Sequence, residues 1–87
     1  MKIIAKPIDI IVTFRKRDKP VPYKFKYPKD TGEMQEIKID KIICVEESNL
    51  AGIAALVYTC QTEIDNQLKI YQLKYIIEEY RWELYKI

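Results

Sequence analysis

The chain has no histidine among its 87 residues. That absence removes the commonest general base, the usual partner of a catalytic serine or cysteine, and the most frequent metal ligand. Glycine is scarce too, and Gly32 and Gly52 alone cannot build a glycine-rich phosphate-binding loop. We therefore expect a protein that is not an enzyme, with no catalytic residue, no metal site and no small-molecule cofactor.

Cysteine is rare and widely spaced. Cys44 and Cys60 are too far apart in the sequence for a CxxC redox or metal motif. They lie in the apolar runs at residues 42–45 and 57–60, which predicts reduced, buried thiols that pack as small hydrophobic side chains.

Long hydrophobic segments are also missing. The longest apolar run, Leu50–Tyr58, is far shorter than the roughly 20 residues that a membrane-spanning helix requires. Lys6, Pro7 and Asp9 interrupt the beginning of the chain, which argues against a signal peptide. We therefore expect a cytoplasmic protein without a membrane partner.

Acidic residues are under-represented in the first half of the chain. Residues 1–41 hold 11 Lys and Arg against 6 Asp and Glu, whereas residues 42–87 hold 4 against 7. The net charge of +2 thus divides into +5 and −3, an asymmetry that favours an acidic partner such as nucleic acid. The simpler alternative is that lysines keep one side of a small sheet soluble.

Alternation of apolar and polar residues dominates the sequence and predicts β-strands. After a loose lead-in over residues 1–7, we expect strands at residues 8–14, 21–27, 33–45 and 53–63. Pro20 and Pro22 remove backbone donors, which suits the beginning of an edge strand. A shift of phase near Lys41 predicts a β-bulge, and Asp65 and Asn66 predict a two-residue hairpin turn.

The last third of the chain fits two patterns. Residues 68–76 and 80–86 alternate as two strands, and the density of Tyr, Ile and Trp favours that interpretation. Five apolar residues also follow the spacing of an amphipathic helix: Ile70, Leu73, Ile77, Tyr80 and Leu84.

The fold class predicted is mainly β, a single small domain of about six antiparallel strands in a small, partly open barrel. The alternative is a β-sheet covered by one C-terminal helix. The predicted core consists of Ile10, Val12, Phe14, Phe25, Ile37, Ile39, Leu56, Tyr58, Cys60, Leu73, Trp82 and Leu84.

Several segments carry a resemblance: PYKFKY, EIKIDKI, a Leu-Ala-Gly before VYTCQ, YQLKY and the terminal RWELYKI. Together they resemble a group of short uncharacterised proteins of Gram-positive, clostridia-type bacteria. The resemblance implies a bacterial, β-rich domain with no assigned activity. The chain departs from that group at Asp65–Asn66, where a glycine-containing turn is expected, and at Tyr80, where a small residue is expected.

The most basic stretch is the hairpin predicted over residues 8–27. Its candidate nucleic-acid-binding residues are Arg15, Lys16, Arg17 and Lys19 at the tip and Lys24 and Lys26 on the return strand. Such cations can follow a phosphate backbone. Alternation places Tyr23, Phe25 and Tyr27 on the opposite face, in the core, so they are not expected to stack on bases.

The competing hypothesis is a protein-interaction or accessory module, or a homodimer. Its support is the apolar Ile11 on an otherwise polar strand face, the proline-bearing edge strand, and an exposed Tyr71 or Tyr85.

Overall fold

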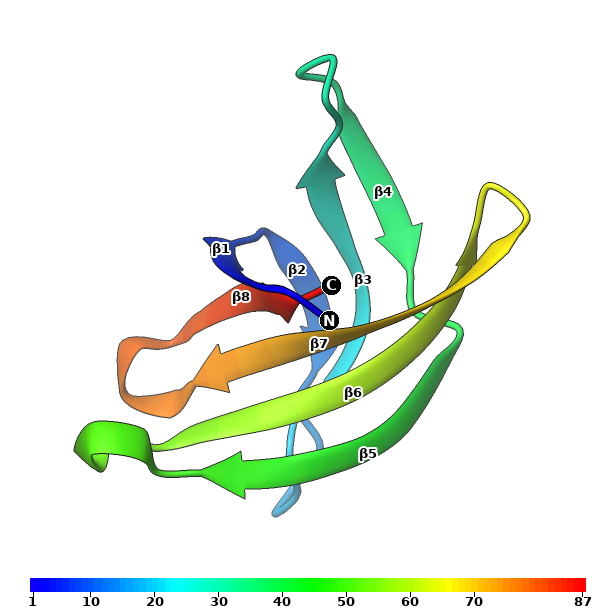
Figure 1. Cartoon of the computed structure of the whole chain (residues 1–87). Helices are drawn as coiled ribbons and strands as arrows, with labels where there is room; N and C mark the ends of the chain where they lie inside the picture. The colour runs from blue at the N-terminus through cyan, green and yellow to red at the C-terminus, as the bar shows by residue number, and fades with distance from the viewer.

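The computed structural model describes residues 1–87 as eight antiparallel strands and two short 3-10 turns (Figure 1). The strands are β1 (Ile3–Pro7), β2 (Ile10–Thr13), β3 (Val21–Pro28), β4 (Met34–Lys38), β5 (Lys41–Ser48), β6 (Ala55–Ile64), β7 (Gln67–Ile76) and β8 (Arg81–Lys86). The turns are η1 (Leu50–Gly52) and η2 (Ile77–Glu79). A five-stranded sheet has the order β1-β8-β7-β6-β5, and a three-stranded sheet has the order β2-β3-β4.

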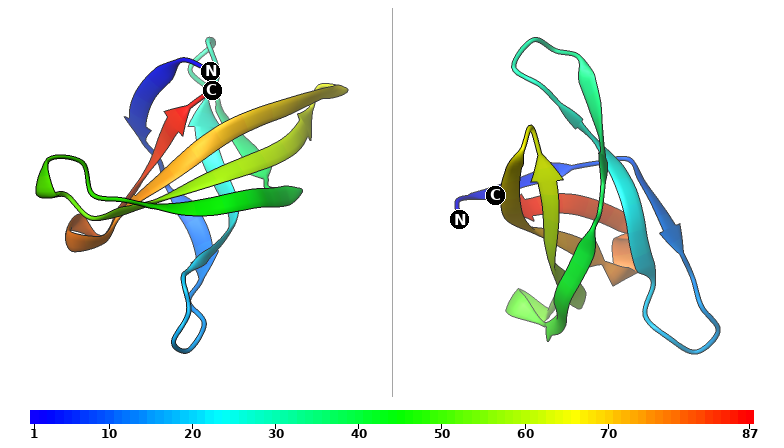
Figure 2. Two further views of the ribbon diagram at one scale, coloured as in Figure 1. Left: turned by 60° about the horizontal axis from the view of Figure 1, so that its bottom comes forward. Right: turned by 90° about the vertical axis from the view of Figure 1, so that its right-hand side faces the viewer.

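The two sheets cross each other and are joined at two corners (Figure 2). At the first corner, the Ile8 amide donates to β8, and the Asp9 carbonyl then accepts from β3. At the second, the Ile39 amide donates to β3 and the Asp40 amide to β6. Strands that bend from one sheet into the other are the usual corners of crossed β-sandwiches. The structure is therefore two packed sheets with eight strands, where the sequence predicted about six strands in a partly open barrel.

Two places account for the additional strands. Ile3–Pro7 is not a loose lead-in but strand β1, which pairs with β8. The long strand predicted over residues 33–45 divides into β4 and β5, because the chain changes sheet at Ile39 and Asp40.

The C-terminal third forms strands β7 and β8, as one of the two patterns predicted. No C-terminal helix is present beyond the three-residue turn η2, and the helix pattern fails because Ile70, Ile77 and Tyr80 are exposed. Asp65 and Asn66 make the predicted two-residue turn, with φ angles of 51° and 64°. Both angles suit a type I′ hairpin turn, which Asn and Asp tolerate without glycine. Neither of the short 3-10 turns could span a lipid bilayer.

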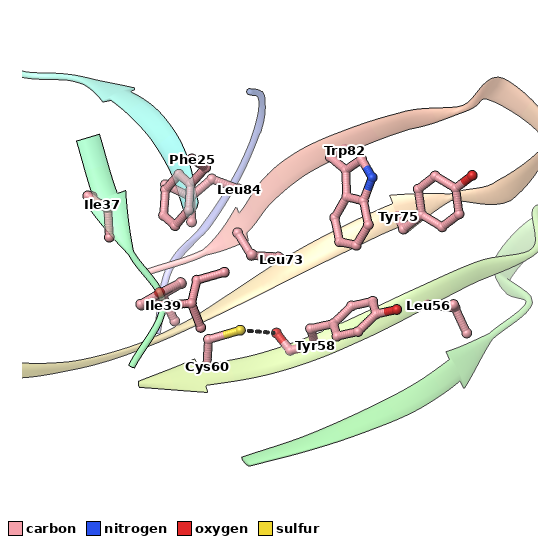
Figure 3. Close-up of a cluster of buried hydrophobic side chains, with 11 residues drawn as sticks. Phe25, Ile37, Ile39, Leu56, Tyr58, Cys60, Leu73, Tyr75, Trp82 and Leu84 are labelled. Carbon is pink, nitrogen blue, oxygen red and sulfur yellow. Dashed lines mark hydrogen bonds between the residues drawn. The ribbon is translucent and has the colours of Figure 1, made fainter. Parts of the chain in front are cut away.

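One cluster of 11 buried side chains lies between the sheets (Figure 3). Nine of the twelve predicted core residues belong to it, and Ile10 and Val12 pack against it while partly exposed. The prediction for Phe14 is wrong, since its side chain is 64% exposed. Strand β2 ends at Thr13, so Phe14 lies beyond the part of the strand that the second sheet covers.

The two cysteines differ in environment. Cys60 is fully buried, as predicted, and burial raises the pKa of its thiol to about 12. Cys44 is exposed and the run at residues 42–45 is not buried, contrary to the prediction. Strand β5 lies at the edge of its sheet, and only Ile42 and Val45 of this run pack against the buried cluster, while partly exposed. The expected β-bulge occurs close by, between Ile42 and Cys44.

Candidate nucleic-acid interface

The predicted basic tip is a loop of residues 14–20 that joins β2 to β3. It projects beyond both sheets at the lower end of the molecule (Figure 1). The Asp18 amide donates to the Arg15 carbonyl at 3.3 Å, and the Asp18 carboxylate accepts from the Lys19 amide at 2.7 Å. Arg17 has a left-handed backbone with φ of 60°. These local bonds close the turn, so its cationic side chains point into solvent, where all of them are exposed.

The tip cations have almost no acidic partners within the protein. Only Lys19 forms an ion pair, with Glu47 at a distance of 4.0 Å between Nζ and Oε1. Arg15, Lys16 and Arg17 form none. Because no carboxylate has to be displaced, these three charges are available to an anionic ligand.

The two strand lysines on β3 differ from each other. Lys24 Nζ lies 2.9 Å from Glu36 Oε1 on β4, and this hydrogen-bonded ion pair raises the pKa of Lys24 and lowers that of Glu36. Lys26 is opposite Glu36 in the strand register but is exposed and forms no ion pair. Lys38 lies opposite Lys24 on the same outer face. The face therefore keeps a positive charge, although Glu36 neutralises Lys24.

The structure corrects the position of Tyr23. The β2–β3 register pairs Ile11 with Lys24 but Val12 with Pro22, so Tyr23 is the extra residue of a β-bulge. Its side chain is 46% exposed, and the Nζ atoms of Lys24 and Lys38 lie 5.9 Å and 5.7 Å from its ring centroid. Tyr23 therefore belongs to the basic outer face.

The other aromatic residues of β3 follow the prediction more closely. Phe25 is buried, with its ring centroid 5.6 Å from that of Tyr71, and Tyr27 packs against the core while partly buried.

The prediction of an edge strand is wrong, because β3 is the central strand of its sheet. Pro22 lies at the bulge instead, another position where the missing amide is tolerated.

We call the tip loop and the outer face of β2–β3 the basic hairpin: Arg15, Lys16, Arg17, Lys19, Tyr23, Lys24 and Lys26. All six predicted cations lie on this one hairpin. The sequence missed Tyr23, and the signal that was available is Pro22 immediately before it, since proline inside a strand often marks a bulge.

The structural basis for the competing hypothesis is mixed. Ile11 is 55% exposed on the outer face of β2, as that hypothesis requires. Tyr71, by contrast, is fully buried. Tyr85 is partly buried, with the Nζ atoms of Lys74 and Lys86 lying 4.6 Å and 5.3 Å from its ring centroid.

No group of three or more His, Cys, Asp or Glu side chains is arranged to hold a metal ion. Comparison with known proteins found no matching family model, no matching curated protein and no matching solved structure. The resemblance to short clostridia-type proteins therefore stays a prediction.

Proposed function

We propose that the protein is a non-catalytic binding module that holds the phosphate backbone of a nucleic acid on its basic hairpin. The observation that carries this proposal is the tip loop, where Arg15, Lys16 and Arg17 project into solvent without an acidic partner. Three such charges next to Lys19 form the largest unneutralised group of cations on one loop of the chain.

Binding of this kind draws its free energy from counterions that leave the nucleic acid. Each neutralised phosphate adds about 0.9 to the negative slope of log K against log salt for a duplex. With four tip cations and Lys26 in contact, we expect a slope of roughly −3 to −5. The affinity is therefore high only at low salt, and phosphate contacts alone confer no sequence preference.

The test is fluorescence anisotropy of labelled single- and double-stranded oligonucleotides across a range of salt concentrations. The informative variant is Lys16→Glu with Arg17→Glu, which reverses two tip charges. Its matched control is Lys41→Glu with Lys69→Glu, which changes the net charge equally at exposed positions on β5 and β7.

We expect the tip variant to abolish binding and the control to retain most of it. If neither the wild type nor the control variant binds an oligonucleotide at low salt, the proposal is contradicted. Equal losses in the two variants would show that overall charge, not the basic hairpin, attracts the ligand.

A protein-interaction module, or a homodimer, is the second candidate. One observation favours it: β2 and β4 are both unpaired edges of the three-stranded sheet, and Ile11 is exposed beside the first of them. An added strand could extend that sheet. Sedimentation of the wild type and of an Ile11→Lys variant over a range of concentrations would detect a dimer through this edge.

A further inference from the structure

A second surface lies beside the tip loop, where the two sheets separate. It is an open groove of about 560 Å³ between β2 and the turn that joins β7 to β8. Seven of its ten lining residues are hydrophobic, among them Ile8, Val12, Phe14, Tyr75 and Trp82, and Tyr80 also lines it. We call it the aromatic groove.

The rings of this groove continue the aromatic row of the core. Tyr58 and Trp82 have ring centroids 5.2 Å apart, and Trp82 and Tyr75 are stacked at 4.8 Å (Figure 3). Phe14 meets Tyr75 edge-on at 6.3 Å. The row thus runs from fully buried Tyr58 to Phe14, which is 64% exposed and open to a further flat ring.

Tyr80 is the second exposed ring. It is 84% exposed, and its backbone is left-handed, with φ of 52°. A bulky side chain in this conformation is uncommon and costs on the order of 1–3 kcal/mol, whereas Gly or Asn closes such a turn at lower cost. The fold gains no buried surface from this ring, so its presence at the groove calls for a role outside the core.

The charges around the groove indicate where the phosphates and where the bases of a bound nucleic acid would lie. The cations of the tip loop begin at Arg15, directly after Phe14. Asp9 lines the groove itself, which disfavours a phosphate there but suits the amino groups of bases. Arg81 also lines the groove, but its guanidinium is paired with Glu79 and Glu83, so it adds no free positive charge there.

We propose that the aromatic groove takes unpaired bases, so that the ligand of the basic hairpin is single-stranded nucleic acid. This inference rests on the proposed function and specifies its partner. Phosphates contact Arg15, Lys16 and Arg17, and one or two bases stack on Phe14 and Tyr80. A duplex hides the faces of its bases and can use only the phosphate contacts.

The test compares a single strand and a duplex of the same sequence by fluorescence anisotropy at low salt. The main variant is Phe14→Ala with Tyr80→Ala, which removes two exposed rings and no charge. The control is Tyr23→Ala, which removes an exposed ring on the basic face. Base–aromatic stacking contributes about 1–3 kcal/mol per ring, which corresponds to a 5- to 150-fold change in affinity.

We expect the wild type to prefer the single strand and the double variant to lose at least tenfold in affinity for it. Duplex affinity and the Tyr23→Ala variant should change little. Fluorescence of Trp82, the only tryptophan, gives a readout that needs no variant, since bases in the groove should quench it while a bound duplex should not.

Three outcomes would overturn the inference. The first is equal affinity for both oligonucleotides, unchanged in the double variant, with no quenching of Trp82 fluorescence. This result would refute base binding in the aromatic groove and leave phosphate binding by the basic hairpin intact. A larger loss from Tyr23→Ala than from the double variant would place stacking on the basic face. No binding of either oligonucleotide at low salt would refute the proposed function as well.

Discussion

The two sheets of this protein differ in how many side chains they contribute to the buried core and in how much of their surface is exposed. The five-stranded sheet contributes eight of the 11 side chains in the buried cluster, whereas the three-stranded sheet contributes only Phe25 and Ile37. The face of the three-stranded sheet turned away from the core carries Ile11, Tyr23 and three lysines, and nothing covers it. The smaller sheet is therefore held in place by the larger one, and its outer face is exposed.

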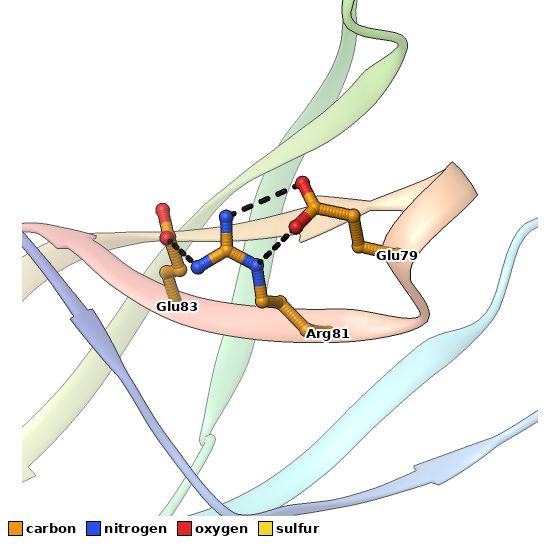
Figure 4. A network of polar contacts seen from close by, with 3 residues as sticks. All are labelled: Glu79, Arg81 and Glu83. Carbon is orange, nitrogen blue, oxygen red and sulfur yellow. Dashed lines mark hydrogen bonds and ion pairs between the residues drawn. The ribbon is translucent and has the colours of Figure 1, made fainter.

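The two sheets also differ in their polar interactions. The Thr62 and Tyr71 hydroxyls are 2.7 Å apart in the interior, and the Tyr58 hydroxyl donates to the Pro20 carbonyl. On the outer side of β8, Arg81 bridges two carboxylates, with Nη1 2.8 Å from Glu83 and Nε 3.3 Å from Glu79 (Figure 4). The three-stranded sheet has a single internal ion pair, Lys24–Glu36.

The largest expected effect is loss of the tryptophan of the larger sheet. Trp82→Ala removes a ring that is 6% exposed and stacks on Tyr75 at 4.8 Å. Replacing a buried Trp by Ala costs about 3–5 kcal/mol, a large part of the total stability of so short a chain. Phe14→Ala is the matched control from the smaller sheet's exposed end and should cost less than about 1 kcal/mol. Urea unfolding curves measure both, and similar midpoints for the two variants would remove the distinction between the sheets.

The second effect is alkaline unfolding driven by the larger sheet. Burial raises the pKa of Tyr58 from 10.0 to about 12 and that of Cys60 from 9.0 to about 12, and it also raises the pKa of Tyr71. The folded state therefore binds these protons more tightly than the unfolded state, so stability is unaffected below pH 9 and falls as the pH rises towards 12. The loss is about 1.4 kcal/mol per pH unit for each group, and it begins near pH 9 for Cys60 and near pH 10 for Tyr58 and Tyr71.

Tyrosinate absorbance and far-ultraviolet circular dichroism, recorded on the same samples, test this effect. Tyr58 and Tyr71 should ionise only as the sheets unfold. If all seven tyrosines ionised together while the dichroism remained native, Tyr58 and Tyr71 would not be buried as the structure places them.

The same division explains what the sequence could predict. The Asp65–Asn66 turn and the six predicted core residues of β6, β7 and β8 follow from local alternation and turn chemistry, because these three strands are consecutive hairpins of the larger sheet. The change of sheet at Ile39 and Asp40 could not be foreseen, since it depends on which strands those residues meet. Alternation alone wrongly placed Phe14 in the core, because it does not show where the covering strand ends.

The charged residues of the candidate site could be predicted from the sequence, whereas the positions of its aromatic residues could not. The six cations follow from their positions on the predicted hairpin, but a bulge moves Tyr23 to the outer face, and this bulge depends on the pairing of β3 with β2. The aromatic groove joins Phe14 to Tyr80 across 66 positions of sequence, and only the packing of β2 against the β7–β8 turn brings them together.

The smallest expected effect concerns the one ion pair of the smaller sheet. Glu36→Gln keeps the shape of the side chain and removes the charge that neutralises Lys24. Both side chains are solvated, so the thermal unfolding midpoint should hardly move. Affinity for an oligonucleotide should rise a few-fold and the salt slope should steepen by about one, because a freed lysine can contact one more phosphate. Lys24→Met with Glu36→Met is the control, since it removes the pair without freeing a charge. An unchanged slope for Glu36→Gln in a protein that still binds through its tip would confine the interface to the loop and exclude the strand face of the basic hairpin.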